Sequence, residues 1–117
     1  MNKGLNKVML IGVVDDEPET RHAPGGRPVT SFTLAVTRSW ASVEGQSKEE
    51  TEWFNIVAWG SLAEICDRRL ERGSRIYLDG RLQTRRWQDS AGKSYFRTEV
   101  VATEILLLDL HTPLADN

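Results

Sequence analysis

The chain has 117 residues, of which 27% are charged and 39% are hydrophobic. This length and balance suit one globular domain with a single core, and no apolar run is long enough to span a bilayer. The single cysteine, Cys66, excludes an internal disulfide, and without clustered histidines it leaves no spacing for a structural metal site.

The net charge of −2 is unevenly distributed along the chain. Residues 72–97 hold seven Lys or Arg against two Asp or Glu, which leaves the remaining residues at −7, with acidic stretches at 15–17 and 49–50. A basic region on an acidic body is typical of a local site for a polyanion. Solvated strand and loop charge gives the same pattern, so charge alone does not decide between the two.

The first predicted strand, residues 6–14, is apolar on both of its faces. Its alternating positions are Val8 and Leu10 on one side, and Met9, Ile11 and Val13 on the other. We therefore expect one face to contact the core and the other to contact a second subunit.

A connection and a second strand follow. Residues 15–28 are rich in Asp, Glu, Pro and Gly, which predicts a turn or hairpin connection. Residues 29–37 alternate as a strand, with Phe32, Leu34 and Val36 on one face.

The polar stretch after Arg38 and Trp40 runs to Glu50 and predicts a long exposed loop. By strand parity Trp40 continues the core face of the preceding strand. A bulge or the end of the strand must therefore intervene for Trp40 to reach solvent.

The third predicted strand, residues 51–60, has two unlike faces. One face carries Phe54, Ile56 and Ala58, and the other carries Trp53, Asn55, Val57 and Trp59. Two indoles on one side of a strand have the spacing of a stacking platform. Paired tryptophans also occur in cores and at subunit contacts, so the stretch by itself leaves these alternatives open.

A helix is predicted to begin directly after this strand. Ser61 and Glu64 have the spacing of a capping box, and Gly73 is placed to end the helix. The apolar stripe consists of Leu62, Ile65, Cys66 and Leu70. We therefore interpret Cys66 as a packed small hydrophobe and not as a reactive thiol.

Two strands complete the predicted fold. In residues 75–83 the inward positions are Ile76, Leu78 and Leu82, and the outward positions are Arg75, Tyr77, Asp79 and Arg81. Arg85 and Trp87 join the outward face if this strand continues. A polar turn at 88–93 leads to a last strand over 95–108, rich in β-branched residues at its centre.

The element order predicts an all-β protein with one short helix, a five-stranded Greek-key barrel of the OB-fold type. We place this domain at residues 1–110, followed by a short tail at 111–117. The N-terminus lacks the pattern of a signal or transit peptide, so we expect a cytoplasmic protein.

Several motifs together resemble the bacterial-type single-stranded DNA-binding protein family. They are NKVMLIG at 6–12, EPETR at 17–21, FTLA at 32–35, TEWF at 51–54, LAE at 62–64, RGS at 72–74, GRLQTRRW at 80–87 and TEVV at 98–101. The resemblance implies base stacking on the aromatic positions, which are Trp40, Trp53, Trp59 and Trp87. It implies phosphate contacts at Lys3, Lys7, Arg72, Arg85 and Arg86.

We add Arg38, Arg81 and Arg97 to the expected phosphate contacts because of the strand faces on which we place them. Asn55 occupies a position that is often basic in the family, so one phosphate contact is expected to be missing. The resemblance also implies a homotetramer with contacts at the first strand and around Phe54. The family's acidic C-terminal tip is absent from this sequence, which ends at Asn117, so replication and repair partners are expected only if such a tip exists.

We expect the protein to bind single-stranded DNA without sequence specificity and to act in DNA replication, recombination and repair. We expect no cofactor and no association with a membrane. His22 and His111 lie in a polar turn and the tail, and no catalytic set is formed by so few candidates. Two alternatives stay open: a metal-dependent nuclease, and an OB domain that uses its tryptophans to dock proteins.

Overall fold

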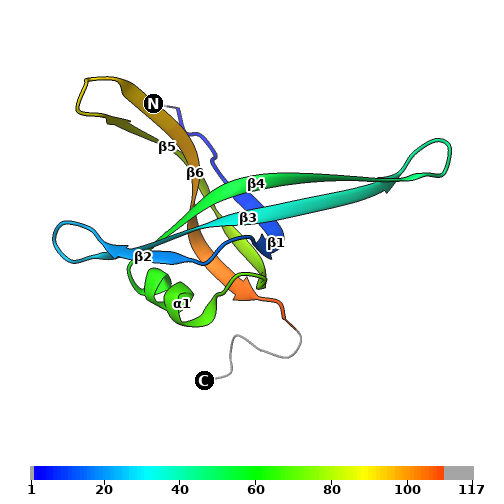
Figure 1. Cartoon of the computed structure of the whole chain (residues 1–117), viewed down its shortest axis with the longest axis horizontal. Coiled ribbons are helices and arrows are strands. Elements are labelled where there is room, and N and C mark those ends of the chain that lie inside the picture. The colour runs from blue at the N-terminus through cyan, green and yellow to red at the C-terminus, as the bar shows by residue number, and fades with distance from the viewer. Residues whose placement is uncertain (1, 110–117) are drawn as a thin grey trace.

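The computed structural model describes residues 2–109, which form one β-sheet and one helix (Figure 1). The predicted tail, and with it His111, lies outside the described residues. The strands and the helix are β1 (Val8–Val14), β2 (Glu19–His22), β3 (Pro28–Ala41), β4 (Ser47–Trp59), α1 (Ser61–Arg69), β5 (Arg75–Gln88) and β6 (Ser94–Leu107).

Five of the strands close into a barrel. The sheet order is β1-β5-β6-β4-β3-β2, and an additional pairing of β1 with β3 joins the two ends of the five-strand portion. The β4–β6 pair is parallel and the other pairs are antiparallel. The predicted OB-fold barrel with one helix is confirmed. The short β2 lies inside the predicted connection and extends the sheet beyond β3.

The core fills the barrel with side chains from the alternating positions. Leu34, Ile56, Ile76 and Leu78 are fully buried, and α1 contributes Cys66 to the same cluster. Burial raises the pKa of the Cys66 thiol to about 12, so the thiol stays protonated at neutral pH. The prediction that Cys66 is a packed hydrophobe is confirmed. Of the residues that the structure describes, none belongs to a helix long and apolar enough to cross a membrane.

Two hairpins extend beyond the barrel as arms (Figure 1). We call them the β3–β4 arm (residues 38–52) and the β5–β6 arm (residues 81–99). The β3–β4 register is unbroken from Val29↔Trp59 to Ala41↔Ser47, so the predicted long loop is wrong and only residues 42–46 form the turn. Both faces of this arm contact solvent, and the sequence therefore shows no apolar alternation there.

The helix begins and ends differently from the prediction. Gly60 is the N-cap, with φ 65° and ψ −134°, and no side chain caps the helix, so the capping box of Ser61 and Glu64 does not form. The amide of Gly60 still donates to Pro28 O at 3.0 Å, so the chain must enter the helix at once, in a conformation that favours glycine. The C-cap is Leu70 in an extended conformation, and Gly73 lies in the following turn.

The inward and outward positions of β5 also need correction. Leu82, predicted to face inward, is 45% exposed because the strand has left the barrel at that point. Asp79, predicted to face outward, is buried, because Tyr77 and Thr103 cover its carboxylate with hydrogen bonds of 2.9 and 2.7 Å. The register shifts between Asp79 and Gly80, where a side chain on Gly80 would collide with Val101 O.

Candidate nucleic-acid interface

The four tryptophans lie outside the buried core. Trp53 is 61% exposed, Trp40 is 42% exposed, Trp87 is 39% exposed, and Trp59 is half-buried. Within this chain the core alternative for the tryptophans is therefore wrong. Their side chains are available to a ligand or to another protein.

Trp53 and Trp59 share the outer face of β4, as predicted. Trp53 pairs with Ala35, whose small side chain leaves the indole uncovered. Trp59 pairs with Val29, and the Arg27 guanidinium carbon lies 5.1 Å from its ring centroid. This face of β4 thus presents one open indole and one indole beside a cation.

Trp40 reaches solvent without a bulge, because β3 simply continues past the end of the barrel. It keeps the parity of the core face, and the Arg38 guanidinium carbon lies 4.5 Å from its ring centroid. Since Trp53 is paired with Ala35, an odd position of β3, Trp40 and Trp53 lie on opposite faces of the hairpin. The structure does not bring these two indoles onto one platform.

The β5–β6 arm carries the densest aromatic cluster. Trp87 pairs directly with Tyr95, and their rings stack with centroids 5.7 Å apart and planes 17° apart. Arg85 lies over Trp87 at 4.8 Å, and Lys93 lies over Tyr95 at 5.4 Å. The aromatic surface of the arm is thus flanked by cations.

Two aromatic residues of this arm were missed by sequence reasoning. Phe96 is 71% exposed, on the face opposite to Trp87, with Arg86 at 5.8 Å. Tyr95 is the stacking neighbour of Trp87. The signal was available, because a hairpin closed at the predicted polar turn places Tyr95 opposite Trp87 and Phe96 opposite Arg86.

Arg85 and Arg97 form a cross-strand pair that shares one buried carboxylate. Glu99, 4% exposed, places Oε2 3.6 Å from Arg97 Nε and 3.9 Å from Arg85 Nε. One negative charge between two guanidinium groups reduces their mutual repulsion and leaves a net positive charge for a phosphate. Arg81 continues the same face, and Arg86 lies on the opposite one.

The remaining predicted cations are spread more widely. Lys3 is exposed in the segment before β1. Two hydrogen bonds between the Asn6 side chain and the backbone of Leu82 hold this segment against β5. Lys7 Nζ lies 4.0 Å from Asp79 Oδ1. Arg72 is exposed in the turn before β5, at the end of that strand opposite to the arm, so it does not join the cluster.

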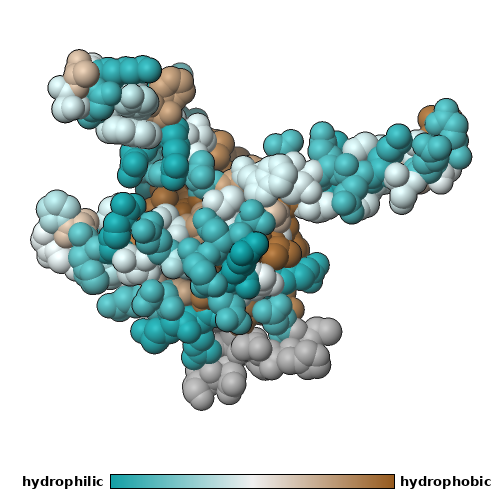
Figure 2. All heavy atoms as spheres, viewed as in Figure 1, coloured by the Kyte–Doolittle hydropathy of each residue, from teal (hydrophilic) through white to brown (hydrophobic). Residues whose placement is uncertain are grey.

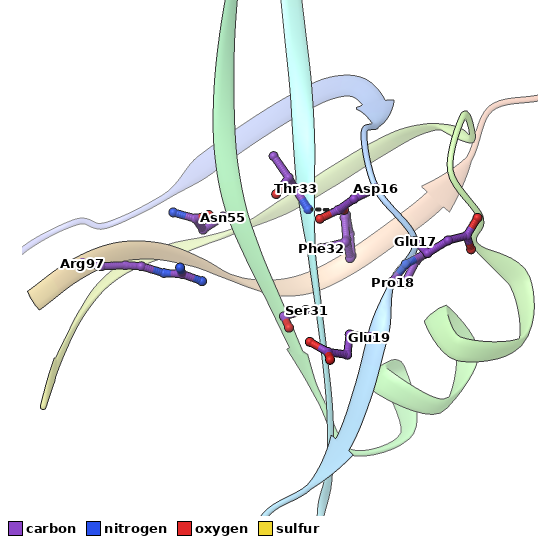
Figure 3. A pocket seen from close by; sticks show the side chains of 9 residues that line it. All are labelled: Asp16, Glu17, Pro18, Glu19, Ser31, Phe32, Thr33, Asn55 and Arg97. Atoms are coloured by element: carbon purple, nitrogen blue, oxygen red, sulfur yellow. Dashed lines mark hydrogen bonds between the residues drawn. The ribbon is translucent and has the colours of Figure 1, made fainter. Parts of the chain in front are cut away.

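An acidic pocket of about 500 Å³ is lined by residues of the β1–β2 connection, β3 and β4, together with Arg97 (Figure 3). Asp16, Glu17 and Glu19 contribute three carboxylates, and Arg97 is the cation in its lining. Asp16 Oδ1 also accepts a hydrogen bond of 2.9 Å from the amide of Thr33, so this acid ties the β1–β2 connection to β3. Figure 2 shows both arms as largely polar, with apolar surface exposed near their bases.

The chain matches the Single-strand binding protein family over residues 5–108. It belongs to this family. It is 46% identical over 109 residues to Single-stranded DNA-binding protein 1 of Chlorobaculum tepidum, a match that covers 92% of this chain and 67% of that protein. The resemblance predicted from the motifs is thus confirmed.

Solved structures give the same result for the fold. The chain is similar to the Plasmodium falciparum SSB in complex with ssDNA, with TM-score 0.81, 34% identity, and coverage of 93% of this chain and 100% of that one. It is also similar to a deletion mutant of the single-stranded DNA binding protein from Thermus aquaticus, with TM-score 0.79, 31% identity, and coverage of 97% and 55%.

Membership in this family bears on the enzyme alternative. Proteins of the family are DNA-binding proteins and not enzymes. Within residues 2–109, the structure contains no group of three or more His, Cys, Asp or Glu side chains that could hold a metal ion. Membership in this family, and not the missing cluster, is what argues against a metal-dependent nuclease.

Proposed function

We propose that the chain binds single-stranded DNA without reading its sequence, and so protects and organises exposed strands during DNA replication, recombination and repair. The observation that carries the proposal is the β5–β6 arm, where the Trp87–Tyr95 stack lies beside Arg85 and Arg97 and away from the core. Membership in the single-strand binding family supports it independently.

The physical basis combines two residue classes. Aromatic rings stack on any base, because every base has a π-face, at about 1–3 kcal/mol per base, while cationic side chains follow the phosphates. Neither contact reads sequence. Bases in a duplex are already stacked on one another and cannot lie on an indole, so binding selects single strands.

Each residue class has an assigned set. We assign base stacking to Trp40, Trp53, Trp59 and Trp87, and we add Tyr95 and Phe96. We assign phosphate contacts to Lys3, Lys7, Arg38, Arg72, Arg81, Arg85, Arg86 and Arg97. Arg38 must weaken its 3.0 Å ion pair with Glu50 to contact a phosphate. Its net contribution to the binding free energy should therefore be smaller than that of an arginine without its own carboxylate.

Tryptophan fluorescence during titration with a poly-pyrimidine oligonucleotide tests the proposal. Base stacking on the exposed indoles should quench the fluorescence strongly, and a duplex of equal length should quench it far less. If the indoles instead form a protein-docking patch, the single strand will leave the fluorescence unchanged, and the proposed function is wrong.

We also propose that the protein forms a homotetramer through the outer face of β1. Met9, Ile11 and Val13 are exposed there, and Ile11 pairs with Tyr77, which in turn pairs with the exposed Leu106. An apolar row of this kind supports a subunit contact. Phe54, around which the other contact is expected, is partly buried against the core cluster, and its place in the assembly stays a prediction.

Analytical sedimentation tests the assembly. The protein should sediment at about four times the 13.2 kDa monomer mass at micromolar concentration, and Ile11→Arg should shift it toward smaller species. Ile65→Arg, on the exposed side of α1, is the matched control and should leave the mass unchanged. A monomer mass for the parent protein would contradict the proposal.

Two further expectations stay predictions. We expect replication and repair proteins to be recruited only if an acidic C-terminal tip exists. Residues 110–117 lie outside the described part of the chain. A cytoplasmic location with the nucleoid DNA follows from the proposed function. Microscopy of a tagged protein that showed it away from the DNA would contradict that location.

A further inference from the structure

A second surface pocket of about 470 Å³ lies where the base of the β5–β6 arm meets the β2–β3 turn and the start of α1. Arg27 comes from the turn, Arg81 and Gln83 from β5, and Trp59 from the end of β4. We propose that this Arg27–Arg81 pocket binds one nucleotide of a single strand, with the base on Trp59 and the phosphodiester between the two guanidinium groups. The inference rests on the proposed function and adds Arg27 to its site.

The charge of the pocket favours a phosphate. Its lining contains two arginines and no Asp or Glu. Among the described residues, neither Arg27 nor Arg81 forms an ion pair with a carboxylate, and Arg81 donates only to the neutral Gln83 Oε1, at 3.0 Å. Two unpaired guanidinium groups that border one pocket form a site for an anion. The acidic pocket, by contrast, has three carboxylates in its lining, which should repel a phosphate.

The position of Arg27 explains how a base and a phosphate fit together. Its guanidinium carbon lies 5.1 Å from the Trp59 ring centroid, and its nitrogens lie 3.8 and 3.9 Å from the point that a Cβ on Gly60 would occupy. An exposed cation–π contact is weak, so an incoming base can displace the guanidinium from the indole. The displaced guanidinium then has the flanking phosphate within reach.

The pocket also joins two parts of the interface. Arg81, Gln83, Arg85 and Trp87 alternate along one face of β5, which begins at the pocket and ends at the Trp87–Tyr95 stack. Trp59 belongs to the outer face of β4 that also carries Trp53. A strand that passes through the Arg27–Arg81 pocket therefore crosses from β4 to the β5–β6 arm without leaving aromatic and cationic contacts.

The slope of log affinity against log salt concentration tests the pocket, with a poly-pyrimidine oligonucleotide as the probe. Arg27→Gln and Arg81→Gln should each flatten the slope by about 0.7, so the parent-to-variant affinity ratio should fall about 2.6-fold when salt rises from about 50 to 200 mM. Arg27→Lys, which keeps the charge, should restore most of the slope. Arg68→Gln, exposed on α1 and outside the pocket, is the matched control and should leave the slope unchanged.

A single-tryptophan protein tests the base contact. Replacing Trp40, Trp53 and Trp87 by Phe leaves Trp59 as the reporter, and the oligonucleotide should quench it, whereas an abasic strand should not. If the parent binds but Arg27→Gln and Arg81→Gln match Arg68→Gln in slope, or Trp59 is not quenched, the pocket inference is overturned and the proposed function stands. If the parent fails to bind single strands, both are overturned.

Discussion

The two arms leave the same barrel with opposite charge. The β3–β4 arm has two basic residues, Arg38 and Lys48, and four glutamates, whereas the β5–β6 arm has five basic and two acidic residues. Both arms expose an indole beside an arginine, Trp40 with Arg38 and Trp87 with Arg85. The same aromatic–arginine pair therefore lies in a negative electrostatic field on the β3–β4 arm, which repels phosphates, and in a positive one on the β5–β6 arm, which attracts them.

The two arms also differ in how their arginines are paired. Arg38 has its own carboxylate, Glu50, at 3.0 Å. Arg85 and Arg97 share the single carboxylate of Glu99, at 3.9 and 3.6 Å, which leaves the pair with a net positive charge. The β5–β6 arm should therefore bind both base and phosphate, while the β3–β4 arm should contribute mainly stacking.

The largest difference between the arms should appear when an indole is removed from each. Trp87→Ala should weaken binding to a single strand by about 1–3 kcal/mol, or about 5- to 150-fold, because the base loses its stack on an arm that also holds the phosphate. Trp40→Ala should cost at most about 1 kcal/mol, since the acidic arm holds the strand less closely. Equilibrium titration at fixed salt measures both. Equal losses would mean that arm charge does not govern stacking.

A smaller difference should appear when the arginines are neutralised. Arg85→Gln should flatten the salt slope by about 0.7, whereas Arg38→Gln should flatten it less, because a phosphate contact at Arg38 competes with Glu50. Glu50→Gln should release Arg38 and steepen the slope. An Arg38→Gln protein whose slope falls as far as that of Arg85→Gln would remove the distinction between the arms.

The smallest effect concerns stability at the base of the β5–β6 arm. Hydrogen bonds from Thr103 and Tyr77 hold the pKa of the Asp79 carboxyl below its ordinary value. Ionised Asp79 therefore stabilises the fold above the unfolded-state pKa of about 4, and this contribution is lost as pH falls through the lower folded-state pKa.

Thermal melting across pH checks this. Asp79→Asn should lower Tm at pH 7, and the gap to the parent should narrow as the pH falls below about 4. Glu49→Gln, at an exposed acid of the β3–β4 arm, is the control and should show little gap at either pH. A gap for Asp79→Asn that stays constant with pH would contradict a lowered pKa.

The barrel could be predicted because burial leaves a periodic signal in the sequence. Ile56, Ala58, Ile76 and Leu78 are buried apolar residues at every second position of their strands, and the same period of two placed Trp53 and Trp59 together on the other face of β4. Cys66 was predicted as a core residue on the same basis. Positions on one strand follow from periodicity alone.

The arms could not be predicted in the same way. Both of their faces contact solvent, so pairing such as Arg38↔Glu50 leaves no apolar pattern, and residues 41–50 resembled a loop. The opposite faces of Trp40 and Trp53, and the pairing of Trp87 with Tyr95, depend on register between strands. Arg27 was missed because its partners, Trp59 and Arg81, come from distant strands. The binding roles of all these side chains stay predictions.

The central claim is that indoles supply a salt-independent part of the affinity and guanidinium groups supply the salt-dependent part. The slope of log affinity against log salt concentration for four variants tests it most directly: Trp53→Ala, Trp87→Ala, Arg85→Ala and Arg86→Ala. The tryptophan variants should lose affinity at an unchanged slope, and each arginine variant should flatten the slope by about 0.7. Tryptophan variants that bind as the parent does, or that change the slope as much as the arginine variants, would contradict the account.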